Sequence, residues 1–256
     1  MFLEFFKYQA TGNDFIIIDN REMLFDKADS ALITSLCERK YGVGADGLIL
    51  LENDKHSDFK MIYFNKDGCE STMCGNGGRC IMHFANLLEI FENDCNFNAI
   101  DGLHKGRIIE DVYSLKMQDV IEIKKFNDYL TLDTGSPHCV NFCENLNDLD
   151  VNIEGGKIRN NKFFKNEGIN VNFVDPNKFS VRTFERGVEE ETFSCGTGTV
   201  ASALSLHFAN YLEEDNIDIL TKGGLLSVSF QEFNGTYKNI WLTGPASLVY
   251  VGEFEC

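Results

Sequence analysis

The chain has 256 residues, of which 43% are hydrophobic and 25% are charged, a composition typical of a globular protein with a sizeable core. Its 40 acidic and 23 basic residues give a formal net charge of −17, which argues against binding to nucleic acid or to an anionic membrane surface. No apolar run is long enough to cross a bilayer, and the N-terminal segment lacks the basic start and cleavage site of a signal peptide.

Strands and helices are expected throughout the first half of the chain. Phe15–Ile18 is a β-branched run closed by Asp19 and Asn20, which predicts a strand and a turn. Apolar residues at helical spacing after a Ser30 cap predict a helix over Ser30–Tyr41. Further expected elements are strands at 48–51 and 60–64, an apolar helix over 76–90, and mostly strands over 108–132.

The second half repeats this pattern after Pro137. Its expected elements are strands at 170–174 and 180–184, an apolar helix over 196–212, and strands near 225–230, 240–243 and 247–252. The Asn- and Asp-rich stretch 141–166 is expected to be a polar surface excursion. Each half is therefore predicted to be several strands around one central helix, an α+β plan.

Four segments of the first half recur in the second half in the same order. They contain Thr11, Asn65, Cys74 and His83, and they recur at Thr134, Phe184, Cys195 and His207, at offsets of 123, 119, 121 and 124 residues. Four matches at nearly one offset indicate a duplicated domain. We expect a first domain over 1–114, joined by a returning C-terminal strand over 247–256, and a second domain over 115–246.

The most informative repeat is Cys-Gly-x-Gly, at Cys74–Gly77 and at Cys195–Gly198. Each copy precedes an apolar run that is expected to be a helix. A cysteine at a helix N-terminus lies in a positive field with backbone N–H groups nearby, so its thiolate is favoured. Glycine lets the backbone approach a ligand closely. Two such turns would form the halves of one active site, with a thiol facing a thiolate.

Two clusters contain zinc-ligand residue types, namely Cys69, Cys74, Cys80 and His83, and then His138, Cys139 and Cys143. Structural zinc sites usually have tight Cys-x2–4-Cys pairs, and the first cluster has spacings of four and five residues. The glycines around Cys74 favour a catalytic turn instead, so no metal site is predicted. The nine cysteines are an odd number and indicate unoxidised thiols in a reducing cytoplasm. Most are expected to be small apolar filler or surface thiols: Cys37, Cys69, Cys80, Cys95, Cys139, Cys143 and Cys256.

The chain resembles the diaminopimelate epimerase family. The matching segments run in order through both halves: Thr11–Phe15, Tyr41–Gly47, Asn65–Cys80, Pro137–His138, Gly168–Phe173 and Glu185–Gly198. A wider superfamily that includes proline racemases shares the Cys-Gly-x-Gly motif. Asn76, and Glu185-Arg186-Gly187 before the second motif, are typical of the epimerase branch.

The resemblance implies two pseudo-symmetric domains, each a barrel-like, mostly antiparallel sheet wrapped around a central helix. It implies a cytoplasmic homodimer that interconverts LL- and meso-2,6-diaminopimelate for lysine and peptidoglycan synthesis. The family uses neither pyridoxal phosphate nor a metal, so no cofactor is expected.

The resemblance also implies site residues. Cys74 and Cys195 are the acid and base; from the LL isomer, Cys195 accepts the proton and Cys74 donates one. His138 and Glu185 would lie near the thiols and tune them. Arg186 would clasp the distal carboxylate in a bidentate contact. The substrate-binding positions by resemblance are Asn13, Asn65, Gly75, Asn76, Asn170, Glu185, Arg186, Gly196 and Thr197.

Three positions depart from the family. Ser136 stands where members often have Asn, and Gly47 stands where some have Gln. An extra acidic residue lies among Glu189, Glu190 and Glu191. These changes put single binding contacts in question, and they leave the cysteine pair intact.

Three alternatives remain open at this stage. A proline racemase or hydroxyproline epimerase would use the same thiols, but it would normally have His in place of Asn76. A thiol redox protein would form a functional Cys74–Cys195 disulfide, but the chain has no Cys-x-x-Cys motif. A non-enzymatic binding module of the same fold would not need a cysteine in both halves.

Overall fold

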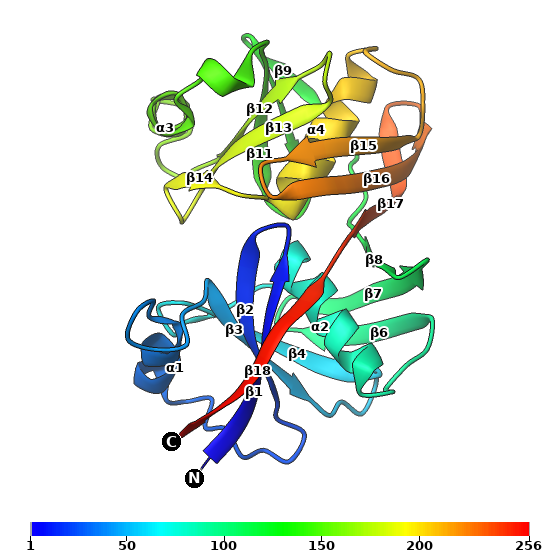
Figure 1. Cartoon of the computed structure of the whole chain (residues 1–256). Helices are drawn as coiled ribbons and strands as arrows, with labels where there is room; N and C mark the ends of the chain where they lie inside the picture. The colour runs from blue at the N-terminus through cyan, green and yellow to red at the C-terminus, as the bar shows by residue number, and fades with distance from the viewer. Residues whose placement is uncertain (1, 256) are drawn as a thin grey trace. The chain divides into compact units, whose positions relative to one another are not determined.

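The computed structural model describes residues 2–255, which form two compact units (Figure 1). The first unit runs to Leu115 and takes in the chain from Gly244 onward, and the second spans Lys116–Thr243. The chain leaves the first unit at the end of β8 (Val112–Lys116) and returns to it at the end of β17 (Thr236–Gly244).

The first unit is a sheet built around one helix. Its helices are α1 (Ser30–Cys37) and α2 (Gly75–Leu87). Its other strands are β1 (Phe2–Ala10), β2 (Asn13–Asp19), β3 (Gly47–Glu52), β4 (Phe59–Asn65), β5 (Glu70–Ser71), β6 (Asp94–Ala99), β7 (Gly102–Ile109) and β18 (Ser247–Glu255). Neighbouring strands pair antiparallel, including β18 with β1, except for the parallel pairs β2–β3 and β4–β6.

The second unit repeats this plan. Its strands before β17 are β9 (Lys124–Phe126), β10 (Tyr129–Asp133), β11 (Pro137–Phe142), β12 (Asn170–Asp175), β13 (Ser180–Glu185), β14 (Glu190–Thr192), β15 (Asn216–Thr221) and β16 (Gly224–Phe233). Its helices are α3 (Val151–Arg159) and α4 (Gly196–Phe208), with a short 3-10 turn, η1 (Leu146–Asp148). The parallel pairs β11–β12 and β13–β15 stand where β2–β3 and β4–β6 stand in the first unit, and the rest pair antiparallel.

The central strands β3 and β12 are buried on both faces, which explains the uninterrupted apolar run Leu48–Leu51 in the sequence. Leu48 and Leu50 of β3 join an outer core under α1, while Ile49 between them points to α2 beside Gly77. In β12, Val171 and Phe173 join the corresponding core under α3. The inner faces wrap α2 and α4, which contact the strands of their own unit. The predicted α+β fold class, a barrel-like sheet around a central helix in each half, is confirmed.

The strand register corrects one of the four sequence matches. Leu48 pairs with Phe64 in the first unit, and Val171 pairs with Phe184 in the second. Asn65 therefore corresponds to Glu185, at an offset of 120 residues, rather than to Phe184. The two predicted binding residues thus occupy equivalent strand ends.

The predicted helices end too late, and one cap is wrong. The N-cap of α1 is Asp29, whose side chain accepts from Leu32 N, rather than Ser30. The helix ends at Cys37 because Glu38 is extended. The left-handed residues Glu89 and Asn210, with φ of 57° and 60°, follow α2 and α4. These two helices therefore end at Leu87 and Phe208, short of the predicted ends at 90 and 212.

Several elements lie where no regular structure was predicted, among them α3, β1, β6 and β15. The Asn- and Asp-rich stretch contains α3, capped by the Asp150 side chain and anchored by buried Val151 and Ile158. Residues 2–10 form β1 although Glu4 and Lys7 interrupt its apolar pattern. No helix within residues 2–255 has the length and apolarity needed to span a bilayer.

Candidate active site

Each Cys-Gly-x-Gly cysteine is the N-cap of the central helix of its unit. Cys74 precedes α2 with φ −91° and ψ 129°, and Cys195 precedes α4 with φ −118° and ψ 115°. Neither side chain caps its helix. The first intrahelical bonds run from Gly78 N to Cys74 O and from Thr199 N to Cys195 O, at 2.7 and 2.9 Å. The N–H groups of residues 75–77 and 196–198 precede these bonds, so the helices do not use them internally.

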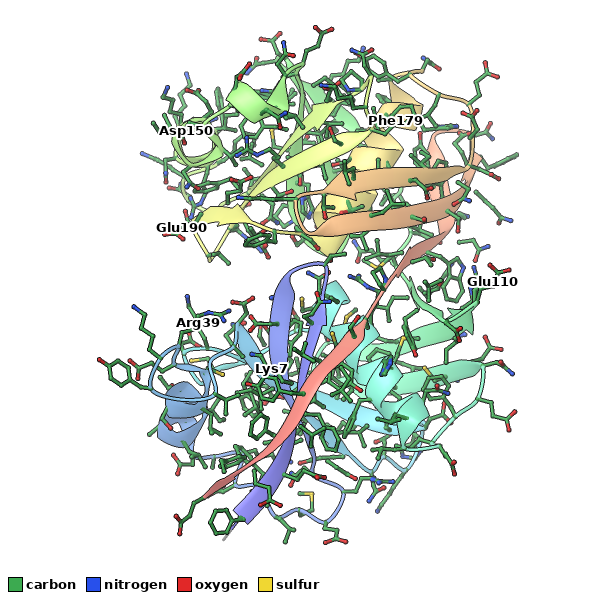
Figure 2. All side chains as sticks on the ribbon, viewed as in Figure 1. Lys7, Arg39, Glu110, Asp150, Phe179 and Glu190 are labelled. Atoms are coloured by element: carbon green, nitrogen blue, oxygen red, sulfur yellow. The ribbon has the colours of Figure 1, made fainter. Side chains whose placement is uncertain are left out.

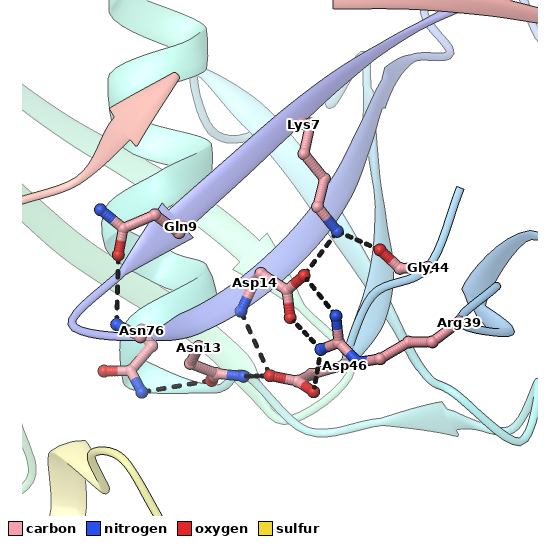
Figure 3. Close-up of polar contacts among 9 residues, drawn as sticks. Lys7, Gln9, Asn13, Asp14, Arg39, Gly44, Asp46 and Asn76 are labelled. Carbon is pink, nitrogen blue, oxygen red and sulfur yellow. Dashed lines mark hydrogen bonds and ion pairs between the residues drawn. The ribbon is translucent and has the colours of Figure 1, made fainter. Parts of the chain in front are cut away.

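The first half-site consists of Cys74, Asn13, Asn76, Arg79 and Asp46. Asn13 stands at the start of β2, between Asn76 and Asp46 (Figure 3). Its Oδ1 accepts from Asn76 Nδ2 at 3.2 Å and from Cys74 Sγ at 3.7 Å. Its Nδ2 donates to Asp46 Oδ2 at 2.7 Å. The structure therefore brings three residues predicted from the motifs, Asn13, Cys74 and Asn76, into one network.

Arg79 is a fully buried cation in the first turn of α2. Its guanidinium donates to Asn76 Oδ1 at 2.9 Å, Thr11 Oγ1 at 3.2 Å, Gly75 O at 3.3 Å and Pro245 O at 3.4 Å. These acceptors are all neutral. Burial lowers the pKa of Arg79 to about 10, against the opposing influence of Cys80 and Cys74. The residue still carries its charge at neutral pH.

Four charged side chains lie behind Asn13. Lys7 of β1 and Arg39, in the segment after α1, both bind Asp14 (Figure 3), at 2.6 and 2.5 Å. Arg39 Nη2 also binds Asp46 Oδ1 at 2.9 Å, and Lys7 donates to Gly44 O. Burial raises the pKa of Asp14, but hydrogen bonds and charge from Arg39 and Lys7 outweigh it and leave the pKa below its usual value. Asp46 thus bridges Arg39 and Asn13 through its two carboxyl oxygens.

The second half-site consists of Cys195, Thr197, His138 and Asn172. Cys195 Sγ lies 3.5 Å from Thr197 Oγ1, which lies 2.9 Å from His138 Nε2. His138 Nδ1 lies 3.0 Å from Asn172 Nδ2, which also donates to Cys139 O at 3.1 Å. A Cβ on Gly198 would lie 2.4 Å from Asn172 Oδ1, so only glycine there leaves this asparagine in place.

His138 is buried as a neutral imidazole. Burial lowers its pKa to about 3, and the charge of Arg186 adds to the effect. Because Asn172 Nδ2 is a donor, His138 Nδ1 must accept and its proton must be on Nε2. His138 is thus positioned by contacts on both of its ring nitrogens.

The remaining predicted residues lie at the ends of β4, β12 and β13. Asn170 Nδ2 donates to Ser136 Oγ at 2.5 Å and to Pro137 O at 3.1 Å, and its Oδ1 accepts from Arg186 N at 2.8 Å. Arg186 is exposed, and its Nη1 donates to Glu167 O at 3.2 Å. Glu185 and Asn65 close β13 and β4 and are half-buried. Asn170 therefore fixes the backbone from which Arg186 projects.

The departures from the family pattern have local explanations. A Cβ on Gly47 would lie 2.5 Å from the Tyr63 ring and 2.6 Å from Phe64 O, so Tyr63 fills the room that a longer side chain would need. Ser136 accepts from Asn170 within the second half-site.

The extra acidic residues lie on and around β14. Glu191 binds Arg182 at 2.6 Å and Lys222 at 3.3 Å, and Glu189 binds Arg159 at 3.2 Å. Glu190 is exposed at the start of β14 (Figure 2). Two of these three acids are thus held in ion pairs within their own unit.

The other cysteines that the structure describes are unoxidised and mostly buried. Burial raises the pKa of Cys37 to about 11 and those of Cys95 and Cys139 to about 12, and it raises the pKa of Cys80 further. Cys69 is exposed and Cys143 half-buried, and Cys256 lies outside the described residues. Within residues 2–255, no group of three or more His, Cys, Asp and Glu side chains is arranged to hold a metal ion.

Sequence reasoning gave no role to three residues that orient the site. Asp46 and Arg79 stand inside the quoted motifs, and Asn172 lies in the middle of a predicted strand. Arg79 follows Asn76 by three residues on a helix, a spacing that places both on one face. Charged residues are rarely fully buried, so composition gave no signal that this arginine is in the core.

The sequence is similar to that of known proteins along nearly its whole length. A family model described as diaminopimelate epimerase matches residues 5–113 and 130–249. The diaminopimelate epimerase of Flavobacterium psychrophilum is 52% identical, covering 97% of this chain and 98% of that protein. The protein of the same name from Chlorobaculum tepidum is 42% identical, covering 95% and 98%.

Solved structures share the fold at low identity. A phenazine biosynthesis protein of the PhzF family from Bacillus anthracis superimposes with a TM-score of 0.75 at 15% identity, over 100% of both chains. A hydroxyproline epimerase from Agrobacterium vitis gives a TM-score of 0.66 at 14% identity, over 98% of this chain and 92% of its own. These likenesses concern the fold alone.

Proposed function

The chain belongs to the diaminopimelate epimerase family, and from this premise we propose that it interconverts LL- and meso-2,6-diaminopimelate without a cofactor. The observation that carries the proposal is the repeated cysteine N-cap. Cys74 and Cys195 begin the central helices of two units with the same strand pairing. Inverting one α-carbon needs a base on one face and an acid on the other, and two equivalent thiols supply that pair.

The proposed reaction transfers two protons and leaves no covalent intermediate. The thiolate of Cys195 removes the α-proton of the LL isomer and becomes a thiol. The thiol of Cys74 then gives its proton to the opposite face of the carbanion and becomes a thiolate. The meso isomer reacts with the roles exchanged. This order is taken from the family and agrees with the hydrogen bonds around each sulfur.

The α-proton is weakly acidic, so the carbanionic transition state needs stabilisation. In the proposal, the backbone N–H groups of Gly75, Asn76, Gly196 and Thr197 point to the α-carboxylate as charge builds on it. Each well-placed donor of this kind is typically worth about 3 kcal/mol. Both cysteines stand directly before these N–H groups, so base and donors come from the same turns.

The distal half of the substrate would be held at the strand ends. We assign Arg186 to the distal carboxylate. We assign Asn13, Asn65, Asn170 and Glu185 to substrate binding, and Glu185 and His138 to tuning the thiols, as the family resemblance implies. The exposed side chain of Arg186 and the hydrogen bond that fixes its backbone N to Asn170 Oδ1 support the role of Arg186. A guanidinium can hold a carboxylate with two parallel hydrogen bonds.

The test is epimerisation in deuterated water. The purified protein is incubated with LL-diaminopimelate, and the isomers are separated and weighed by mass spectrometry. We expect meso product carrying one deuterium at the inverted carbon, because the second thiol delivers a solvent-derived proton. Product that keeps the original hydrogen would contradict the two-thiol scheme. L-Proline and trans-4-hydroxy-L-proline serve as comparison substrates, and inversion of either at a similar rate would favour the proline racemase alternative.

We also propose a cytoplasmic homodimer that serves lysine and peptidoglycan synthesis. The nine cysteines suit a reducing compartment. β18 pairs with β1 and carries the exposed apolar side chains Val249, Tyr250 and Val251, which favours a subunit contact there. Light scattering on the purified protein should give twice the chain mass of 29.0 kDa.

A further inference from the structure

The side-chain amides of Asn13 and Asn76, beside Cys74, each have one possible orientation. Asp46 sets the orientation of Asn13, and Arg79 sets that of Asn76. Asp46 Oδ2 only accepts, so the Asn13 atom 2.7 Å away must be Nδ2. Arg79 only donates, so the Asn76 atom 2.9 Å from Nη2 must be Oδ1. Asn76 Nδ2 then donates to Asn13 Oδ1 at 3.2 Å. Flipping either amide would place two donors or two acceptors face to face.

This direction presents an acceptor to the sulfur of Cys74. Asn13 Oδ1 lies 3.7 Å from Sγ, at a distance at which a thiol can donate its hydrogen. A thiolate facing the same oxygen would gain no hydrogen bond and would meet a partial negative charge. A contact to the neutral form disfavours ionisation, so this network favours the protonated sulfur.

At Cys195 the donors run in the opposite direction. Cys139 O only accepts, so Asn172 Nδ2 faces it and also donates to His138 Nδ1. The proton on His138 Nε2 then faces two hydroxyl oxygens, Thr197 Oγ1 at 2.9 Å and Ser136 Oγ at 3.3 Å, and the shorter contact is to Thr197. Because the Thr197 hydroxyl oxygen accepts from His138, its own hydrogen can be donated to Cys195 Sγ at 3.5 Å. A donor at the sulfur favours the thiolate.

We propose that Asp46, Arg79 and Asn172 are positioning residues that make the two half-sites unequal at rest, with the proton on Cys74 and the negative charge on Cys195. The inference rests on the proposed function only where it names these sulfurs as acid and base. One turnover from the LL isomer moves a proton onto Cys195 and removes one from Cys74. After that turnover the Cys74 thiolate faces the acceptor Asn13 Oδ1 and the Cys195 thiol faces the donor Thr197 Oγ1, so each sulfur has a less favourable contact than at rest.

Charged groups approach Cys74 from several elements, and the test must separate charge from direction. Arg79 comes from α2, and Asp101 accepts from Met73 N at 3.1 Å. The remaining charges belong to the network behind Asn13: Lys7, Asp14, Arg39 and Asp46. Near Cys195, the charge of Arg186 acts on His138.

The experiment measures the alkylation of each cysteine by iodoacetamide against pH, in the full-length protein without substrate. Peptide mass spectrometry reads Cys74 and Cys195 separately in the same sample. We expect the pH midpoint of Cys195 to lie at least about one unit below that of Cys74. Equal midpoints, or a lower one at Cys74, would overturn the inference.

Asp46→Asn tests the direction of the amides at Cys74. Asparagine can donate or accept, so Asn13 is freed to turn Nδ2 toward the sulfur. The midpoint of Cys74 should fall by about half a pH unit or more, while that of Cys195 stays unchanged. Asp46→Ala should act in the same direction because water can also donate or accept, and it replaces Asp46→Asn if that variant does not fold.

Two variants control for the loss of charge. Asp14→Asn and Asp101→Asn each remove a nearby carboxylate without removing the contact to Asn13. Their Cys74 midpoints should shift less than that of Asp46→Asn. An equal shift in all three would show that charge alone acts and would contradict the inference.

Thr197 supplies the matching test at Cys195. Thr197→Val removes the hydroxyl and should raise the Cys195 midpoint only, whereas Thr197→Ser keeps the hydroxyl and should leave it in place. An unchanged Cys195 midpoint in Thr197→Val would contradict the proposed series of hydrogen bonds from Asn172 through His138 and Thr197 to Cys195. These readouts need no turnover: unequal midpoints in a protein inactive on diaminopimelate would reject the proposed function alone, and equal midpoints in an active one would reject this inference alone.

Discussion

The two units share one strand plan and differ in the side chains beneath their cysteines. On the inner face of the sheet, Phe15 and Ile49 of the first unit correspond in register to His138 and Asn172 of the second. In the first turn of the central helix the difference is reversed, because Arg79 corresponds to apolar Val200 at the same offset that relates the two cysteines. The buried polar groups that differ between the units are therefore a helix residue, Arg79, in the first and two strand residues, His138 and Asn172, in the second.

This exchange shows how a symmetric fold can hold an asymmetric site. The backbone that presents each sulfur is the same, since both cysteines are extended N-caps. The buried groups behind them carry different charge at neutral pH. Burial lowers the pKa of Arg79 to about 10 and that of His138 to about 3, so the arginine stays charged and the histidine stays neutral.

The largest expected effect comes from removing either thiol. Cys74→Ser and Cys195→Ser should each lower kcat for diaminopimelate by about 10²- to 10⁴-fold, because an alcohol is a far poorer acid–base group at neutral pH. Exchange of the α-hydrogen with deuterated water should survive on the face served by the remaining cysteine. Cys69→Ser and Cys143→Ser, one in each unit, are the controls and should keep full activity. Wild-type rates in Cys74→Ser would rule out the assigned roles.

Arg186 belongs to the second unit, and the first unit has Lys66 at the corresponding position. Replacing Arg186 should therefore affect one end of the substrate. Arg186→Lys keeps the charge but loses the planar fork, so kcat/KM for diaminopimelate should fall by about 10- to 100-fold. The loss should be smaller for an analogue without the distal carboxylate. Arg159→Lys, which alters a nearby arginine bound to Glu189, is the matched control. Equal losses for both substrates would place Arg186 elsewhere.

The fold was readable from the sequence where burial is two-sided. Continuous apolar runs such as Leu48–Leu51 predict buried strands, and the register confirms them. β1 was not predicted because Lys7 breaks its pattern, and the ion pair with Asp14 and the hydrogen bond to Gly44 O make the burial of Lys7 tolerable. α3 was missed because its few apolar residues gain stability from the core of the second unit rather than from helix propensity.

The candidate site was readable where a motif names the residue. Cys74, Cys195, Asn13 and Asn76 stood in matched segments, and the structure links three of these by hydrogen bonds. Their roles in substrate binding stay predictions. The orienting function of Asp46 and Asn172 was not readable, because it depends on which atom faces which across strands distant in sequence. The direction of such hydrogen bonds can be assigned only when the three-dimensional structure shows which donor or acceptor stands at each end of the series.

The neutral state of His138 predicts a pH effect on stability that the first unit lacks at the equivalent Phe15. The unfolded chain binds a proton at this histidine below pH 6.5, while the folded chain resists it down to about pH 3. Stability therefore falls as the pH drops below 6.5, by at most about 1.4 kcal/mol per pH unit. His138→Gln should flatten the slope of unfolding free energy between pH 6.5 and 5. An unchanged slope would mean that His138 is protonated in the fold.

The smallest effect concerns a contact that both units keep. Tyr8 OH lies 2.9 Å from His83 Nδ1, and Tyr237 OH lies 3.0 Å from His207 Nδ1, near the end of each central helix. Burial raises the pKa of Tyr237 to about 12 and that of Tyr8 further, so both hydroxyls remain protonated and can donate. Tyr8→Phe and Tyr237→Phe should each lower the free energy of unfolding by about 1 kcal/mol, because a histidine acceptor loses its donor. Urea unfolding measures this, with exposed Tyr41→Phe as the control near zero. Similar losses would show that the duplication kept this contact at equal strength, and a loss confined to one unit would show that the two contacts have diverged as the cysteine supports have.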